Sequence, residues 1–343
     1  MTNLNTVAVA PRRVLVLGGA GFLGTHLVRG LVGEGIAVRT FDRQPAPGRP
    51  QALPEESDVQ GDANPLPGVE TLAGDFVSGE GLAEALADVD VVYHLVSTTV
   101  PSTSNADPIA DVEGNLIGTL RLLKLMEASG VTQIVYVSSG GTVYGNPTIL
   151  PVPESHPLEP LCSYGVVKVA VENYLRMYSE LYGLTANVLR VSNPYGTHQH
   201  HIGVQGVIPT FFKKISEGTS IEIWGDGSVV RDYLHVSDVV SALLLAGART
   251  NSDTFNIGSG IGYSVNEILE VVQRQTGRSA DVSYLPQRKF DVERIFLDIA
   301  KARDGLGWQP KLSLEAGCAL YWQEVRQLVA GHDAARPTSE PPK

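Results

Sequence analysis

Two residues that could move a proton stand four positions apart, in a stretch whose apolar pattern predicts a helix over residues 163–182. Tyr164 and Lys168 lie on one face of such a helix, so the ammonium can rest beside the phenol. A free phenol has a pKa of about 10, so it is a poor base at neutral pH unless positive charge stabilises the phenolate. The pair predicts a tyrosine base, with Lys168 as one source of that charge.

The context of this pair matters, because Tyr and Lys fall four apart by chance in many helices. Small and hydroxyl residues, Ser138 to Thr142, follow an expected buried strand, Gln133 to Val137. The end of such a strand faces the nicotinamide in a dinucleotide-binding sheet. An oxidised nicotinamide would bring a second positive charge to the phenol.

A glycine-rich turn predicts where that dinucleotide binds. Gly18, Gly21 and Gly24 directly follow a short apolar strand, Val14 to Leu17, and precede an expected helix, Phe22 to Leu31. Without side chains, the turn lets the backbone approach a pyrophosphate while the helix amides point at it.

Acidic residues follow two later strands. Asp42 ends the second strand, where a carboxylate can accept hydrogen bonds from ribose hydroxyls and repel a 2'-phosphate. This position favours NAD over NADP, although the adjacent Arg43 softens the preference. Asp75 stands where another strand end would bring a carboxylate near the adenine.

Strands and helices alternate along the first part of the chain. The expected strands are Val14 to Leu17, Ala37 to Phe41, Val89 to Leu95, Gln133 to Val137 and Leu184 to Val191. The expected helices are Phe22 to Leu31, Asp111 to Ser129 and Ser163 to Tyr182. This alternation predicts an α/β fold, a Rossmann-type doubly wound parallel sheet.

The rhythm changes after Pro194, where short helices mix with brief strands. We therefore expect an NAD-binding Rossmann domain over 12–192, to which some later segments could return, and a smaller C-terminal substrate-binding α/β lobe over 193–330. Residues 44–68 are rich in Pro, Gly and acidic side chains and are expected to form a surface loop. The tail, 331–343, is expected to be disordered.

The composition argues against several classes of partner. The net charge is −11 and no dense basic run occurs, which argues against nucleic acid. The N-terminus lacks a signal-peptide core and Val239 to Ala248 is too short to span a bilayer, so no membrane partner is expected. The two cysteines form no disulfide framework, which fits a reducing, cytoplasmic location. His198, His200 and His201 lack a completing ligand, so no metal site is expected.

Six motifs together resemble one family. They are GGAGFLG at 18–24, HLVS at 94–97, SSGGTVYG at 138–145, YGVVK at 164–168, RVSNPYG at 190–196 and GSVVRDYLHVSDVV at 227–240. In order and spacing they are similar to the extended short-chain dehydrogenase/reductases of the NAD-dependent epimerase/dehydratase family, in particular the UDP-glucose 4-epimerase-like branch. The likeness runs from about Val14 to Leu328.

The resemblance implies roles for the predicted pair. Tyr164 would remove the proton from a sugar 4-hydroxyl while the carbon is oxidised by NAD, and Lys168 would lower the tyrosine pKa and hold the nicotinamide ribose. The 4-keto sugar would then turn over and be reduced from its other face. Residues 140–142 lack the Asp-Glu pair of the related sugar dehydratases, which disfavours dehydration.

One position departs from the family pattern. The residue three before the Val of the VYG motif is usually Ser or Thr, hydrogen-bonded to the reacting oxygen, and here it is Gly140. Thr142 matches another hydroxyl position in epimerases and could replace it, and Ser139 is a second candidate.

The resemblance also implies the binding residues. For the cofactor they are Gly18, Gly21, Phe22, Leu23, Gly24, Asp42, Arg43, Asp75, Phe76, Leu95, Ser97, Ser138, Tyr164 and Lys168. For the sugar nucleotide they are Thr142, Asn193, Val207, Ile223, Arg231, Arg288 and Asp291, with the two arginines on the diphosphate. Ile295 occupies the family's gate for bulky sugars, and its intermediate size leaves glucose, N-acetylhexosamine and uronate open.

Three hypotheses about the function are open at this point. The first is a UDP-sugar 4-epimerase, acting as a homodimer through helices 111–129 and 163–182, as the resemblance implies. The second is a 4-ketoreductase of a deoxysugar nucleotide that consumes NADH or NADPH. The third, a sensor that lost catalysis through Gly140, is opposed by the presence of Tyr164 and Lys168.

Overall fold

The computed structural model describes residues 13–43, 68–199, 206–286 and 292–335. Its centre is a seven-stranded sheet with the order β10-β6-β5-β4-β1-β2-β3, in which every neighbouring pair is parallel. The strands are β1 (Arg13–Leu17), β2 (Ala37–Asp42), β3 (Val69–Ala73), β4 (Val91–His94), β5 (Gln133–Ser139), β6 (Thr185–Val191) and β10 (Asp253–Ile257). Because the order reverses between β1 and β4, a crevice opens there at the carboxyl ends of the strands.

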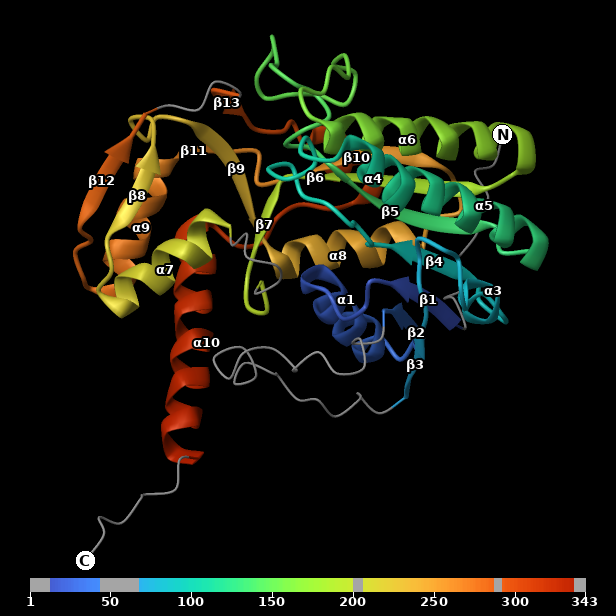
Figure 1. The fold of residues 1–343 in the computed structure, drawn as a ribbon, viewed down its shortest axis with the longest axis horizontal. Coiled ribbons are helices and arrows are strands. Elements are labelled where there is room, and N and C mark those ends of the chain that lie inside the picture. The colour runs from blue at the N-terminus through green and yellow to red at the C-terminus, as the bar shows by residue number, and fades with distance from the viewer. Residues whose placement is uncertain (1–12, 44–67, 200–205, 287–291, 336–343) are drawn as a thin grey trace, which may run out of the picture.

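Helices cover both faces of this sheet (Figure 1). One face carries α1 (Phe22–Gly33) and α8 (Val236–Gly247), and the other carries α3 (Leu82–Ala85), α5 (Gly118–Ser129) and α6 (Ser163–Tyr182). The side chains of β1 alternate between two cores, with Val14 and Val16 in the first and Leu15 and Leu17 in the second. A strand buried on both faces reads as a continuous apolar run, as this one does.

The second lobe lies beside the end of the large sheet (Figure 1). Its strands are β7 (Asn193–Tyr195), β8 (Ile221–Trp224), β9 (Val230–His235), β11 (Gly262–Ser264), β12 (Val282–Leu285) and β13 (Arg294–Ile295). Its helices are α7 (Val207–Glu217), α9 (Val265–Thr276) and α10 (Leu314–Ala335). Strand β9 pairs with β7, β11 and β13, so it carries residues from four separate segments to one place.

Three late segments belong to the first lobe. Strand β10 extends its sheet beyond β6, and α8 packs against α1 on one face. A π-helical turn, η2 (Ala302–Leu306), adds Ala302 and Leu306 to the core on that face. The chain therefore returns from the second lobe to the first twice, at α8 with β10 and again at η2.

The helix expected over 111–129 is interrupted. It consists of α4 (Pro108–Asp111), a π-helical segment η1 (Val112–Ile117) and α5. A Cβ on Gly114 would lie 2.5 Å from Thr98 Oγ1, and one on Gly118 would lie 2.6 Å from the Phe76 ring. The close approach of Gly114, with the Asn115 side chain accepting from Thr98 N at 2.8 Å, ties the segment to the loop after β4. The close approach of Gly118 ties it to Phe76, which follows β3.

Helix α10 continues to Ala335, four residues past Gly331, where the tail expected to be disordered begins. Residues 336–343 and the expected loop at 44–67 lie outside the described residues.

Candidate active site and cofactor cradle

The glycine turn after β1 is tight and has no room for side chains. Gly18 has a φ of 86°, and its N–H donates to the Phe41 carbonyl at 3.0 Å. A Cβ on Gly24 would fall onto the Gly18 carbonyl, and one on Gly19 would lie 2.6 Å from Thr40 Cγ2. Helix α1 begins after Gly21 with no side-chain cap, which leaves its first amides to an anion.

Asp42 borders this turn from the end of β2. Its Oδ2 accepts a hydrogen bond from Ala20 N at 3.0 Å. Burial raises the pKa of Asp42 to about 6, against the opposing effect of the Ala20 and Gly19 amides. A carboxylate held beside the glycines, with a second oxygen available, fits the adenosine ribose of a dinucleotide.

Arg43 and Asp75 contact each other across the neighbouring strand ends. Arg43 Nη2 lies 3.6 Å from Asp75 Oδ1, which also accepts from Val77 N at 2.7 Å. The structure brings both residues together beside the ends of β2 and β3, but Asp75 is also part of the local turn. The Arg43 charge is thus partly neutralised.

The other predicted cofactor residues differ in exposure. Phe76 is buried and its ring packs on His94, with 5.0 Å between centroids, so its side chain belongs to the core rather than to the cradle. Leu95 and Leu23 are half-buried against the core of the α1 face. Phe22 contacts His26 edge-on at 5.8 Å, and the exposed Ser97 donates from its hydroxyl to Thr99 O at 2.9 Å.

Tyr164 and Lys168 lie together at the end of β5, as their spacing predicts. Lys168 Nζ is 5.3 Å from the centre of the Tyr164 ring and 4.8 Å from that of Tyr136. The ammonium donates to the Val137 carbonyl at 2.9 Å, which fixes it against β5. Their helix, α6, has the bounds that the sequence predicts, Ser163–Tyr182.

Burial dominates the titration of both groups. It raises the pKa of Tyr164 well above its ordinary value; Cys162 and Asp111 add to this, and a hydrogen bond with Ser97 opposes it. It also lowers the pKa of Lys168 to about 8, against the opposing carboxylates of Glu172 and Asp111. In the ligand-free protein the phenol is therefore protonated at neutral pH, and Lys168 alone does not make it a base.

The packing around Gly140, in the segment after β5, explains why this position carries no hydroxyl. A Cβ on Gly140 would lie 2.5 Å from Leu297 Cδ1 and 2.9 Å from the Arg190 carbonyl, so no side chain fits there. Thr142 Oγ1 is buried and has no hydrogen-bond partner among the described residues. An orphaned hydroxyl at this place can be satisfied by a ligand.

The two serines of this segment are used differently. Ser138 Oγ donates to Glu172 Oε1 at 2.5 Å, so its hydroxyl is already engaged within the protein. Only the backbone of Ser138 is then available to bind a cofactor. Ser139 accepts from the amides of Thr142 and Val143 through its carbonyl, at 3.3 and 3.1 Å. Ser139 therefore shapes the turn that presents Thr142.

A cavity of about 330 Å³ opens where the second lobe meets this edge. It is lined by Asn193, Pro194, Tyr195, Gln199, Gly206, Val207, Ile208, Pro209, Arg231 and Tyr233. Three predicted substrate residues, Asn193, Val207 and Arg231, thus meet here. Tyr195, Gln199 and Tyr233 were not predicted. The pairing of β7 with β9 brings the two tyrosines together, and Gln199 joins them by donating to the Pro194 carbonyl at 3.1 Å.

The contacts of these residues orient them. Asn193 donates to the Asp232 carbonyl at 2.8 Å, which leaves its own oxygen for a ligand. Arg231 donates to Val292 O at 2.5 Å. Ile223 does not line the cavity: it is 3% exposed in the core of the second lobe, because alternate side chains of β8 point inward.

Other predicted positions fall elsewhere. Arg288 and Asp291 lie outside the described residues, as do His200 and His201. Ile295, expected as a gate, is buried against Val143 and Tyr144. No group of three metal-ligating side chains occurs among the residues that the structure describes, and no helix in that part of the chain is long and apolar enough to cross a membrane.

A second cavity, of about 810 Å³, lies between α6, β6 and β10 and contains none of the predicted site residues. Its lining holds paired charges, among them Glu172 with Arg190 and Asp253 with Lys301. Tyr164, Lys168 and Thr142 lie instead at the carboxyl end of β5, on the same edge of the sheet as the glycine turn that follows β1.

Known proteins resemble the chain over most of its length. It is 36% identical to a UDP-glucose 4-epimerase of Mycolicibacterium smegmatis over 312 residues, covering 90% of this chain and 96% of the relative. It is 34% identical to a dTDP-4-dehydro-6-deoxyglucose reductase of Escherichia coli over 321 residues, covering 91% and 97%.

Two solved structures share the fold. The UDP-glucose 4-epimerase of Thermotoga maritima with UDP-glucose has a TM-score of 0.83 and 34% identity, covering 92% of this chain and 99% of that one. The UDP-glucose 4-epimerase of Thermus thermophilus in complex with NAD has a TM-score of 0.81 and 33% identity, with the same coverage. The sequence profile described as "NAD dependent epimerase/dehydratase family" matches residues 14–258. The glycine turn and Asp42 are of the kind that binds a dinucleotide. This chain therefore belongs to the NAD-dependent epimerase/dehydratase family and uses NAD as its cofactor.

Proposed function

We propose that the protein interconverts C4 epimers of a UDP-linked hexose, with Tyr164 as the group that exchanges a proton with the sugar 4-hydroxyl. The observation that carries this is the pairing of the half-buried Tyr164 with the buried Lys168, together with the orphaned Thr142 hydroxyl in the turn that follows β5. We infer that a sugar whose nucleotide lies in the 330 Å³ cavity extends to these three side chains.

The residues at the glycine turn are suited to NAD. The amides after Gly21 would hold the pyrophosphate, Asp42 the adenosine ribose and Lys168 the second ribose. Bound NAD supplies reversible oxidation of the sugar carbon, together with a positive charge beside the phenol. Asp42 would repel a 2'-phosphate, which favours NAD over NADP.

Each side chain then has one task. Tyr164 accepts the proton of the 4-hydroxyl when positive charge beside it offsets the burial that raises its pKa. The Thr142 hydroxyl donates to the same oxygen, in place of the side chain for which Gly140 leaves no room. Lys168, fixed by the Val137 carbonyl, supplies a positive charge near the ring while its ammonium keeps its proton.

We assign binding of the nucleotide half of the substrate to the second lobe. Asn193 and Arg231 point polar groups at the cavity, and a guanidinium there suits a diphosphate. The UDP-glucose in the Thermotoga maritima structure supports uridine as the base. Arg288 and Asp291 remain proposals for the same diphosphate and its ribose.

A second candidate function is reduction of a 4-keto deoxysugar nucleotide. The Escherichia coli reductase, 34% identical over almost the whole chain, favours it. The two functions share the tyrosine and lysine, so they differ in whether reduced cofactor is consumed.

We also propose a homodimer through α5 and α6. Apolar side chains on and before these helices are exposed, with Ile109 at 72%, Val166 at 53% and Leu181 at 66%. Burying such a patch against a second copy is the simplest way to remove it from water. Light scattering after gel filtration would report a single chain if this is wrong.

The two cysteines support a reducing compartment, and we propose the cytoplasm. Cys162 and Cys318 are both free thiols. Intracellular thiols stay reduced, whereas small secreted proteins use them as staples.

The test is incubation of the purified protein with UDP-glucose, UDP-N-acetylglucosamine and UDP-glucuronate, each without added reductant, followed by NMR of the products. A 4-epimer would support epimerisation and name the sugar. Tyr164→Phe should abolish turnover and keep NAD bound. Conversion only of a dTDP-4-keto sugar, with stoichiometric loss of NADH, would replace epimerisation by the reductase reaction.

A further inference from the structure

A buried ion pair stands one helical turn beyond Lys168. Arg190 Nη2 lies 2.7 Å from Glu172 Oε2, and the two side chains are only 7% and 8% exposed. Arg190 Nε lies 3.2 Å from both carboxylate oxygens. This multiple contact holds the Glu172 carboxylate in a single orientation.

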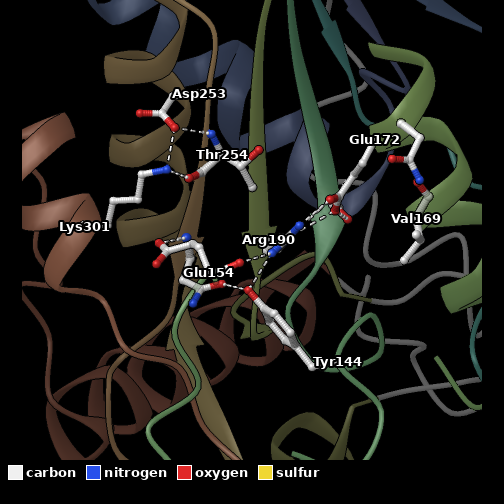
Figure 2. Close-up of polar contacts among 11 residues, drawn as sticks. Tyr144, Glu154, Val169, Glu172, Arg190, Asp253, Thr254 and Lys301 are labelled. Carbon is white, nitrogen blue, oxygen red and sulfur yellow. Dashed lines mark hydrogen bonds and ion pairs between the residues drawn. The ribbon is translucent and has the colours of Figure 1, made fainter. Parts of the chain in front are cut away.

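The pair is fastened from several elements (Figure 2). Ser138 on β5 donates to Glu172 Oε1, and Arg190 donates through Nη1 to Tyr144 OH at 2.9 Å and to the Glu154 carbonyl at 3.2 Å. Helix α6 is thereby locked to β5, to β6 and to the segment that follows Thr142. A shift of α6 along its axis would break these bonds together.

Lys168 needs such support because it is buried. The side chain is 6% exposed, and its ammonium donates to a neutral carbonyl, that of Val137. An isolated ammonium in such a place tends to lose its proton. Its ionisable neighbours are Tyr164 and Glu172 on α6, Asp111 on α4, Tyr136 on β5 and His94 on β4.

Of these neighbours only two are negatively charged at neutral pH. Tyr136 and Tyr164 are neutral phenols, and burial lowers the pKa of His94 to about 3, so its ring is uncharged. Of the two carboxylates, Glu172 raises the Lys168 pKa more than Asp111 does. Glu172 also stands four residues after Lys168, the spacing at which a helix brings side chains together.

We propose that Glu172, held by Arg190 and Ser138, is a positioning residue that keeps the Lys168 ammonium charged and in place beside Tyr164. Glu172 touches neither the sugar nor the cofactor in this assignment; it acts through Lys168. The inference rests on the proposed role of Lys168 in the proposed function, but its test does not need a substrate.

The test is the titration of Lys168 in the NAD-bound protein labelled with ¹³C-lysine, followed by NMR, with the signal assigned through Lys168→Arg. Glu172→Gln should lower the Lys168 pKa by about one unit, the effect of removing one neighbouring opposite charge. Glu172→Asp should restore part of the shift. If a folded Glu172→Gln protein titrates like the parent, the proposal is overturned.

A matched control exists on the same helix. Glu180 pairs with Arg176 at 3.2 Å in an exposed i,i+4 pair, so Glu180→Gln removes an α6 carboxylate without touching the buried one. The Lys168 titration should not change in it. An equal shift in this control would reduce the effect to net charge and overturn the assignment to Glu172.

A double variant covers the case in which Glu172→Gln does not fold, because that change leaves Arg190 buried without its partner. Glu172→Gln with Arg190→Gln removes both charges and retains amide donors toward Tyr144. The reference for it is Arg190→Gln alone, because the two proteins then differ only in the Glu172 carboxylate. The Lys168 pKa should be lower in the double variant than in Arg190→Gln, and equal titrations would mean that the pair only holds the fold.

Activity gives a second readout where a substrate has been found. If the Lys168 pKa is one unit lower, the ammonium loses its proton at a pH one unit lower. The alkaline limb of the pH profile of kcat should therefore move down by about one pH unit. A variant that loses activity equally at every pH contradicts the proposal, even if it is folded. Failure of every UDP-sugar would count against the proposed function alone, because the NMR titration tests the role of Glu172 without a substrate.

Discussion

Replacing Asp42 by Asn should stabilise the ligand-free protein while weakening NAD binding. Burial raises the pKa of Asp42 from 3.8 to about 6, and one pKa unit corresponds to about 1.4 kcal/mol. The ionised carboxylate therefore costs the folded state up to about 3 kcal/mol above pH 6. Below about pH 4 the group is protonated in the folded and unfolded chains alike, so the cost vanishes there.

The Asn side chain can still accept from Ala20 N, the contact that Asp42 makes at 3.0 Å, so the substitution removes mainly the charge. Urea unfolding of NAD-free protein at several pH values should show a gain that appears between pH 4 and pH 6. Calorimetry should show NAD binding at least about tenfold weaker at pH 8, because a charged acceptor for the ribose is lost.

Asp90 provides the control for this experiment. It accepts from Arg13 N at 3.0 Å, a bond of the same kind, but its position is exposed. Asp90→Asn should change the free energy of unfolding by less than about 1 kcal/mol and leave NAD binding intact. A loss of stability in Asp42→Asn at pH 8, or a gain of equal size at pH 4 and pH 8, would refute the reasoning.

Three further substitutions test the crevice. Gly24→Ala would place a Cβ on the Gly18 carbonyl, so we expect a loss of about 1–3 kcal/mol in stability and no measurable NAD binding by calorimetry. Gly140→Ala should cost a similar amount in urea unfolding and should not raise turnover, because Leu297 and the Arg190 carbonyl occupy the space; a stable, faster variant would contradict this packing. Thr142→Val should lower kcat about a hundredfold without lowering Tm, because the hydroxyl it removes has no partner to lose among the described residues, and full activity would exclude Thr142 as the helper.

The large sheet follows from local features of the sequence. Strand β1 is a continuous apolar run from Val14 to Leu17, because both of its faces are covered by helices. Helix α6 ends at Tyr182 because Gly183 adopts a φ of 70°, which other residues avoid. Such signals are readable without knowing the partner segments, and the Rossmann-type sheet predicted from them is confirmed.

The second lobe depends on contacts that no local pattern records. Strand β9 has the sequence VRDYLH, with neither alternation nor a continuous apolar run, and it forms because three other strands pair with it. Its Asp232 is buried and accepts hydrogen bonds from Ser259 N at 2.7 Å and Leu297 N at 3.2 Å. An acidic residue would ordinarily be assigned to the surface, so the sequence could not place it.

The same limit applies inside the site. The spacing of Tyr164 and Lys168 predicts their proximity, but the protonated state of Tyr164 follows from its burial in the fold, to which Asp111, distant in sequence, adds. Likewise the Glu172 and Arg190 pair joins α6 to β6, and neither residue stands out in its own segment.

Gly140 shows how a departure from a family pattern is to be interpreted. Taken alone, the absent hydroxyl argues for lost catalysis. In the fold, Leu297 from the far end of the chain packs where that side chain would lie. The absence of a side chain at Gly140 thus makes room for the side chain of Leu297. The nearby Thr142 hydroxyl is buried with no partner among the described residues, which costs about 1–3 kcal/mol unless a ligand satisfies it. A chain that had lost its reaction would have no reason to retain that cost, so the structure favours a helper hydroxyl that has moved two residues along the same turn.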